Sequence, residues 1–303
     1  MSTFTAIDLS RLPPPNVVEP LDFESILAER KAALVALHPP EQQAAIASTL
    51  ALESEPLTKH LQENAYRELL LRQRINSAAK AVMLSYAQKE DLDQLGALFG
   101  VLRLQIAPGD PMYGIAPTME PDEDYRRRIQ LSLEGFSTAG PEGAYIFHAL
   151  SADGQVLDAS ATSPVEGKVL VSVLSRTGDG TASQPLLDKV DAVVSADDTR
   201  PLTDWVVVQS AQILPYQIDA TLFMFSGPSS DVVMANARAA VEEYVAESHR
   251  LGRDITLSGI YAALHQPGVQ RVLLTGPVAD IVVTRTQAAY CTGINLTMGG
   301  LGE

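Results

Sequence analysis

The feature of this sequence that most constrains its fold is a stretch without proline or glycine, residues 57–86. Its second part, YRELLLRQRINSAAKAVMLSYA (66–87), is typical of a single long helix. A continuous helix over 57–86 is about 45 Å long at 1.5 Å per residue. Pro56 fits the first turn of this helix, where a missing N–H costs nothing. The sequence therefore predicts an elongated helical element near the N-terminus.

Apolar residues lie on two opposite sides of this predicted helix at about 100° per residue. One side carries Leu71, Ile75, Ala78, Ala79, Val82 and Tyr86, and the other carries Tyr66, Leu70, Ala81 and Leu84. A helix that is apolar on two faces needs cover on both faces. Two explanations are open. Either the chain's own helices at 22–37 and 90–103 cover both faces, or one face meets helices of other chains in a bundle.

The rest of the chain divides into a helical first half and a second half in which strands alternate with helices. Residues 107–121, APGDPMYGIAPTMEP, hold four prolines and two glycines and are typical of a linker. The predicted fold class is α+β, with an N-terminal all-helical bundle arm followed by two small α+β modules. The predicted parts are a helical arm (1–106), a Pro/Gly linker (107–121), a helical connector (122–153), a first α+β module (154–214) and a second α+β module (215–303).

Strands are predicted where β-branched and apolar residues alternate with polar ones. The predicted strands are 168–176, 204–213, 216–225, 269–276, 280–286 and 290–298. In YQIDATLFMF (216–225), the even-numbered apolar residues from Ile218 to Met224 point one way.

Charge and apolar content restrict the class of protein. The net charge of −15 repels phosphate backbones, so nucleic-acid binding is not expected. The short basic run Arg126–Arg128 is expected to form a solvated face paired with Asp122, Glu123 and Asp124. No apolar run is long enough to predict a membrane span, and the N-terminus lacks the basic start and apolar region of a signal peptide. The sequence therefore predicts a protein made in a cytoplasm.

No motif in the sequence predicts an active site, a cofactor site or a metal site. The single cysteine, Cys291, lies in the apolar run AAYCTGINL and is expected to be a small buried residue. The five histidines lack metal-ligand spacing. The acidic groups in 91–93 and 122–124 begin predicted helices, where carboxylates favour the helix dipole. We therefore assign no catalytic, cofactor-binding or metal-binding residue, and we expect a protein that is not an enzyme.

Longer segments resemble the baseplate assembly protein J (baseplate J-like) family of contractile-tailed phages and phage-tail-like bacteriocins. The segments are EPLTKHLQENAYRELLLRQRINSAAKAVMLSYAQKEDLDQLGALFGV, DEDYRRRIQLSLEGFSTAGPEGAYIFHALSA, VLVSVLSRTGDG, RPLTDWVVV, LGRDITLSGIYAALHQPGV and ADIVVTRTQAAYCTGI. The resemblance covers roughly residues 20–295 in order. Where this family usually has glycine before the DLD turn, this chain has Lys89, which puts a left-handed helix cap there in question.

The resemblance implies a structural wedge protein of the tail baseplate. It implies assembly with a baseplate I-type partner, with further copies of the chain and with the central spike or hub and sheath-proximal proteins. The protein would be made in the host bacterial cytoplasm and end in the baseplate. A tail-associated cell-wall hydrolase and a free cytoplasmic adaptor of the same fold are the alternatives.

With this resemblance, burial of one face of the 57–86 helix against another chain is the favoured explanation. The predicted interface residues are Tyr66, Leu70, Leu71, Ile75, Ala78, Ala81, Val82, Leu84 and Tyr86. In this hypothesis, the linker 107–121 lets the helical arm and the α+β modules reorient when the tail contracts.

Overall fold

The structure is a computed structural model, and it describes residues 21–302 except Thr138 and Pro228, together with Leu9, Leu12, Pro13 and Glu19. The N-terminal stretch that lacks signal-peptide features otherwise lies outside the described residues. Two compact units make up the described chain. One spans Ile7–Gly100, and the other contains Val101–Glu303.

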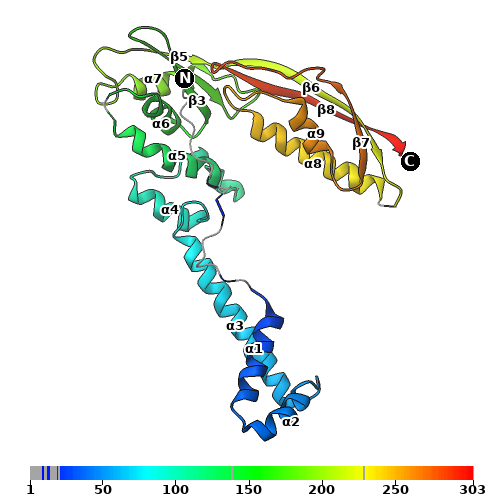
Figure 1. The fold of residues 1–303 in the computed structure, drawn as a ribbon. Coiled ribbons are helices and arrows are strands. Elements are labelled where there is room, and N and C mark those ends of the chain that lie inside the picture. Colours follow the sequence, from blue (N-terminus) through cyan, green and yellow to red (C-terminus); the bar gives the residue numbers. More distant parts are fainter. Residues whose placement is uncertain are drawn as a thin grey trace. The chain divides into compact units, whose positions relative to one another are not determined.

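The first unit is helical (Figure 1, blue to cyan). Its helices are α1 (Phe23–Ala36), α2 (Pro40–Leu50), α3 (Pro56–Ala81) and α4 (Lys89–Leu98). Asp22 caps α1 by accepting hydrogen bonds from the backbone N–H groups of Glu24 and Ser25. A small core joins α1, α2 and α3, formed by Ile26, Leu27, Leu50, Leu61 and Ala65.

Helix α3 ends at Ala81, before the predicted end at 86. The backbone N–H groups of Tyr86 and Ala87 donate to the Met83 carbonyl at 2.9 and 2.8 Å, which turns the chain away from the helix axis. Lys89 has a φ of 48°, in the left-handed region, so the conformation that favours glycine is adopted here by a lysine. The chain between α3 and α4 therefore adopts the left-handed conformation at Lys89 although no glycine is present there.

The second unit contains two sheets, and the first sheet has the strand order β3-β4-β5. Its strands are β3 (Val156–Val165), β4 (Lys168–Ser175) and β5 (Trp205–Ser210). Strands β3 and β4 form an antiparallel hairpin, whereas β5 lies parallel to β4 after the crossover helix α7 (Gln184–Val194). Helix α5 (Asp122–Gly135) packs on α6 (Glu142–Ala152), and α6 packs on the sheet beside α7 (Figure 1, green).

The second sheet has the order β7-β6-β8. Its strands are β6 (Gln212–Met224), β7 (Val269–Gly276) and β8 (Gln287–Leu301). Helices α8 (Ser230–Ser248) and α9 (Leu257–Leu264) cover one face of this sheet. The predicted alternation along β6 is confirmed, because Ile218, Ala220, Leu222 and Met224 are all buried against these helices. The predicted strand at 280–286 is wrong, since only Ile281 forms an isolated bridge there, with Ile255.

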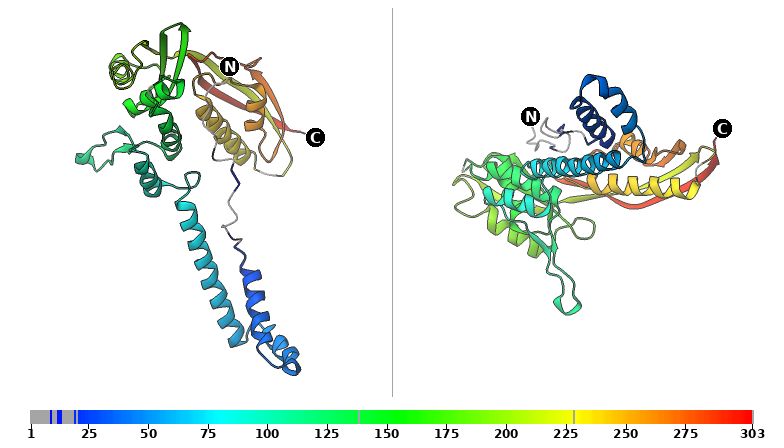
Figure 2. Two further views of the ribbon diagram at one scale, coloured as in Figure 1. Left: turned by 60° about the vertical axis from the view of Figure 1, so that its left-hand side comes forward. Right: turned by 90° about the horizontal axis from the view of Figure 1, so that it is seen from below.

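Residues 105–119 form a hairpin in the second unit, where the sequence predicts a linker. It consists of β1 (Gln105–Ala107), the short 3-10 helix η2 (Pro111–Tyr113) and β2 (Thr118–Met119). Gln105 pairs with Met119, and Ala107 pairs with Thr118. The backbone N–H of Glu120 donates to the Leu104 carbonyl at 2.8 Å, which closes the base. The hairpin projects from the body of its unit, as the right-hand view of Figure 2 shows.

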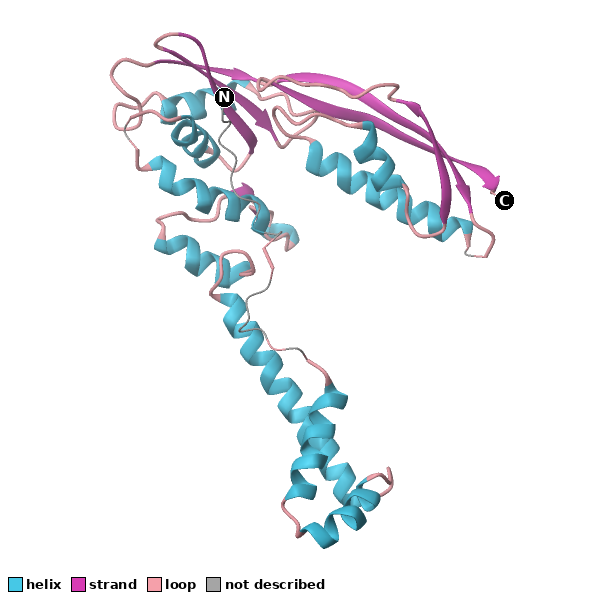
Figure 3. Ribbon diagram, viewed as in Figure 1, coloured by secondary structure: helices cyan, strands magenta, loops and turns pink. Residues whose placement is uncertain are grey.

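The structure confirms the predicted α+β class with a helical N-terminal region. Among the described residues, every strand lies after Val101, in the second unit (Figure 3). The finer predicted boundaries at 106, 121, 153 and 214 stay predictions. In the described part of the chain, no helix is both long and apolar enough to cross a membrane.

Candidate partner interface

One predicted apolar stripe of α3 is open to solvent at most of its positions, and Ala79 on it is half-buried. Leu71, Ile75 and Val82 keep 62%, 61% and 71% of their surface exposed. Ala78, on the same side, is also exposed. These side chains recur at i, i+4, i+7 and i+11, the spacing with which one helix presents a seam to another.

The second predicted stripe is open at Tyr66 and Leu70, and Ala81 at its end is half-buried. Leu84 and Tyr86 lie beyond the end of α3, so their predicted place on a helical stripe is wrong, while their place in a partner interface stays a prediction. Both follow the end of α3, and the Tyr86 hydroxyl donates to the Leu12 carbonyl at 2.9 Å. The Lys80 ammonium lies 5.7 Å from the centre of the Tyr86 ring.

Helix α1 packs on a third side of α3, between the two apolar stripes. This side carries the buried residues Leu61, Ala65 and Asn76. Glu68 on the same side accepts hydrogen bonds from Arg30 of α1 and from Arg72. The helix that covers α3 within its unit therefore leaves Tyr66, Leu70, Leu71, Ile75 and Val82 exposed.

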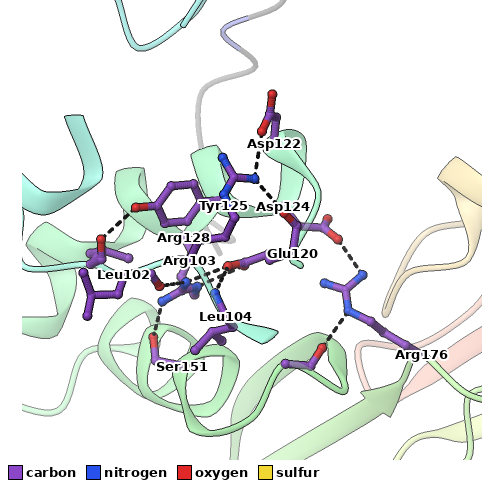
Figure 4. Close-up of polar contacts among 12 residues, drawn as sticks. Leu102, Arg103, Leu104, Glu120, Asp122, Asp124, Tyr125, Arg128, Ser151 and Arg176 are labelled. Carbon is purple, nitrogen blue, oxygen red and sulfur yellow. Dashed lines mark hydrogen bonds and ion pairs between the residues drawn. The ribbon is translucent and has the colours of Figure 1, made fainter. Parts of the chain in front are cut away.

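A buried ion pair holds the base of the hairpin in the second unit (Figure 4). Arg128 of α5 donates from Nε and Nη2 to the two carboxylate oxygens of Glu120, at 3.0 and 2.6 Å. Both side chains are almost fully buried, at 4% and 5% exposed. Arg128 Nη2 also donates to the Leu102 carbonyl at 2.6 Å, and Glu120 accepts from the Leu104 N–H at 3.2 Å. One arginine and one glutamate thus tie both ends of the hairpin to α5.

The acidic start of α5 makes its pairs with residues outside the helix. Arg103 pairs with Asp122 at 2.8 Å, and its guanidinium lies 4.6 Å from the centre of the Tyr125 ring. Asp124 pairs with Arg176 of β4 at 2.6 Å and with Arg250 at 2.8 Å. The expected solvated pairing of Arg126–Arg128 with Asp122, Glu123 and Asp124 is therefore wrong for Arg128, which is buried and turns to Glu120.

The same cluster joins the two sheets of the second unit. Arg250 lies after α8, and its Nη1 donates to the Leu157 carbonyl of β3 at 2.7 Å. Asp158 of β3 pairs with Arg127 at 3.0 Å and accepts from the Leu251 N–H at 3.0 Å. Burial raises the pKa of Asp124, but the charges and hydrogen bonds of Arg250 and Arg176 outweigh it, and the net pKa is lowered. The sequence gives no periodic signal for these pairs, because their partners come from different elements.

The described residues contain no group of three or more His, Cys, Asp or Glu side chains placed to hold a metal ion. Cys291 is half-buried and lies 3.3 Å from the Gly293 carbonyl, and burial raises the pKa of its thiol. His249 and His265 occupy the C-terminal caps of α8 and α9. The interactions described so far hold the fold, whereas the exposed stripes of α3 are left as the candidate contact surface.

Three family models match successive parts of the chain. They are the Baseplate J-like N-terminal domain at residues 53–110, the Baseplate J-like central domain at 137–210 and the Baseplate J-like protein C-terminal domain at 216–297. The central family model ends where β5 ends and the C-terminal one begins within β6, whereas the N-terminal one continues past Gly100 into the hairpin of the second unit.

One relative matches almost the whole chain. Baseplate protein J of Escherichia phage P2 is 55% identical over 300 residues, which cover 98% of this chain and 99% of that protein. A solved structure of the anti-feeding prophage baseplate covers 48% of this chain and 36% of the matched chain, at 14% identity and a TM-score of 0.37. A likeness at that level carries no argument about this fold. On the near full-length identity and the three matching models, the chain belongs to the Baseplate J-like family.

Proposed function

We propose that the chain is a structural wedge protein in the baseplate of a contractile phage or phage-like tail. In this role it is made in the bacterial cytoplasm and assembles with a baseplate I-type protein, and with further copies of itself, around the central spike. Support for the baseplate role comes from the 55% identity to Baseplate protein J of phage P2 over nearly the full length.

One observation carries the assembly part of the proposal. Helix α3 is a long helix with exposed apolar side chains on two sides, although α1 already packs on a third side. Contiguous exposed apolar surface on a rigid element is typical of protein contact sites. Helices of partner chains can add to such an element by seating their own apolar side chains between Leu71, Ile75 and Val82.

The test compares two pairs of glutamine substitutions in α3. Leu71→Gln with Ile75→Gln removes one apolar stripe, and Tyr66→Gln with Leu70→Gln removes the other. Glutamine is a good helix former, so α3 is kept. We expect one of these pairs to weaken the complex with the co-expressed I-type protein by roughly 30-fold or more, because the loss of even one central apolar contact costs about 2 kcal/mol. Light scattering of the purified complex measures the loss.

Leu133→Gln serves as the matched control, because Leu133 is an exposed leucine on α5, in the other unit. It removes exposed apolar area without touching α3 and should leave the complex intact. If both α3 pairs assemble like the unmodified chain, α3 is not the contact surface. If the unmodified chain does not bind the I-type protein, the proposed wedge role is wrong.

The proposed role includes a rearrangement of the wedge when the tail contracts. Residues 107–121 are less suited to act as its hinge than the sequence suggests, because pairing within the hairpin and the Glu120–Arg128 pair hold both ends together. The two compact units join at Gly100–Val101, and Gly100 has a φ of 70°. We expect the angle between the units to change at this junction. Tail structures before and after contraction measure it, and an unchanged angle contradicts the hinge.

A further inference from the structure

Strand β8 (Figure 1, red) forms one edge of the second sheet over 15 residues. Its inner side pairs with β6 from Gln287 to Leu301. On its outer side, the Gly252 N–H donates to the Gln287 carbonyl at 3.0 Å, and Leu251 forms an isolated bridge with Ala288. Among the described residues, no strand lies on the outer side beyond this bridge. The rest of the edge therefore presents backbone groups that a further strand can pair with.

The open backbone groups belong to alternate residues of β8. In a parallel pair, the N–H and C=O of one residue point to the same side, and those of the next residue point to the other side. The Ile294 carbonyl accepts a hydrogen bond from Arg238 Nη1 of α8 at 3.4 Å, so we place it on the outer side. The pairing with β6 is regular from Ile294 to Met298. The backbone groups of Leu296 and Met298 therefore point outward as well.

Strand β8 lacks the features that usually prevent pairing at a sheet edge, which are charged residues, proline and short length. Residues 287–301 contain no Asp, Glu, Lys, Arg or Pro, and the register shifts of β8 lie outside 293–298. The other outer strands of the two three-stranded sheets are protected. Strand β3 contains Asp158 and Pro164, β5 has six residues, and β7 exposes Arg271. Strand β8 is therefore the edge best suited to accept another strand.

Helix α8 sets the charge beside this edge, because it packs on β8. It carries one guanidinium, which pairs at 3.7 Å with one of its four exposed carboxylates. These residues are Arg238 and Asp231, Glu242, Glu243 and Glu247. Alternate side chains of a strand added outside β8 lie on the α8 side. Lysine or arginine at these positions is favoured by the excess of negative charge on α8.

We propose that the outer edge of β8 binds an extended segment of another protein that carries lysine or arginine at alternate positions. The segment adds a fourth strand to the second sheet by pairing with residues 294–298. Its basic side chains lie beside the carboxylates of α8. The strands of this chain do not fit this description, since Lys168 of β4 and Arg271 of β7 are the only basic residues in the described strands. The proposal goes beyond the wedge role and uses neither apolar stripe of α3.

Amide hydrogen exchange of the full chain, followed by NMR, tests the edge. The probe is the synthetic peptide acetyl-TKVKVKVKT-amide at about 1 mM, where weak binding is populated. We expect exchange of the Leu296 and Met298 amides to slow about 10-fold or more, because both become hydrogen-bonded. The peptide TEVEVEVET, in which glutamate replaces lysine, is the charge control and should have little effect. No slowing with the lysine peptide, slowing at another strand instead, or equal slowing with both peptides overturns the proposal.

A matched pair of substitutions at one position of β8 tests the backbone pairing. Met298→Pro removes the outward N–H, whereas Met298→Ala shortens the same half-exposed side chain and keeps the N–H. Proline is accepted on an edge strand where its nitrogen faces solvent, so the sheet is kept. We expect the proline variant to bind the lysine peptide about 10-fold more weakly than the alanine variant. Equal binding by the two variants contradicts strand addition.

A charge reversal on α8 tests the choice of a basic segment without altering the strand. Glu242→Lys should weaken binding of the lysine peptide about 5-fold and strengthen binding of the glutamate peptide. Glu41→Lys, at an exposed position of α2 in the helical unit, makes the same change in net charge and should leave both affinities unchanged. Equal effects of the two variants mean that α8 does not select the segment, and the proposal is then wrong. Neither residue lies on α3, so binding of the I-type protein is measured independently.

Discussion

Replacing Glu120 with alanine is expected to destabilise the second unit by about 3–5 kcal/mol, because it leaves the Arg128 guanidinium buried without its carboxylate. The Glu120 carboxylate accepts two hydrogen bonds from Arg128 and one from the Leu104 N–H in the folded chain. In this variant Arg128 Nε and the Leu104 N–H lose this acceptor, and Arg128 Nη2 keeps only its bond to the Leu102 carbonyl. The base of the hairpin then keeps the backbone pairing of β1 with β2 and the hydrogen bond from Arg103 to the backbone carbonyl of residue 120, but loses its buried carboxylate.

Urea unfolding followed by tryptophan fluorescence measures the effect of this change. Trp205 is the only tryptophan of the chain and lies in β5, so its signal reports on the second unit and not on the helical arm. Glu247→Ala is the control, since Glu247 and Arg253 are about half exposed and 3.9 Å apart. Loss of such a surface pair costs about 0–1 kcal/mol. Similar shifts for the two variants would mean that burial of the Glu120–Arg128 pair has no special importance.

Replacing Asp124 with asparagine is expected to weaken the connection between the two sheets and to remove an acid-sensitive part of the stability. Asp124 bridges Arg176 of β4 and Arg250 after α8, and its side chain is only 13% exposed. Loss of the charge leaves two arginines without their shared carboxylate, for an expected cost of about 3 kcal/mol at neutral pH. We expect the second sheet to unfold before the first in this variant, which appears as two transitions in urea where the unmodified unit has one.

The pH dependence of this effect follows from the lowered pKa of Asp124. A carboxyl whose pKa is lower in the folded state contributes stability above its unfolded pKa of about 3.9, and the contribution is lost as the pH falls through the folded value. The difference between the unmodified chain and Asp124→Asn should therefore be constant from neutral pH to about pH 5 and shrink below pH 4. Urea midpoints across this range measure it. Asp231→Asn, at an exposed carboxylate in the first turn of α8, is the control and should show a small difference throughout.

The sequence predicts the elements whose buried residues are apolar and periodic. Strand β7 has the predicted bounds, and β6 buries the predicted face. Strand β3 lacks a purely apolar buried face, because its buried side chains include Asp158 and Ser160. Asp158 is bound by Arg127 and the Leu251 N–H, and the Ser160 hydroxyl donates to the Arg285 carbonyl. These partners are distant in sequence, so polar residues that fold inward look like surface residues in the sequence alone.

In the candidate interface, the sequence predicts the apolar residues of α3 but not the end of the helix. Helical periodicity identifies both apolar stripes of α3, and Leu71, Ile75 and Tyr66 are exposed. The predicted helix is too long and includes Leu84 and Tyr86, because no proline or glycine marks the helix end at Ala81. A turn closed by backbone hydrogen bonds to Met83 ends the helix there. Local composition does not reveal such a turn.

The pairing of β6 with β8 sets the order in which this chain can fold during its synthesis. The two strands are parallel over their whole length, from Gln212 with Gln287 to Met224 with Leu301. Strand β6 therefore emerges from the ribosome long before its neighbour, and loop closure over such a separation is slow. The second sheet completes only after Leu301 has left the ribosome, whereas the helical arm lies within Ile7–Gly100 and can fold while the second unit is still being made. Newly made chains thus pass through a stage with a finished arm and an unfinished sheet, in which the apolar side of β6 depends on α8 and α9 alone for protection from aggregation.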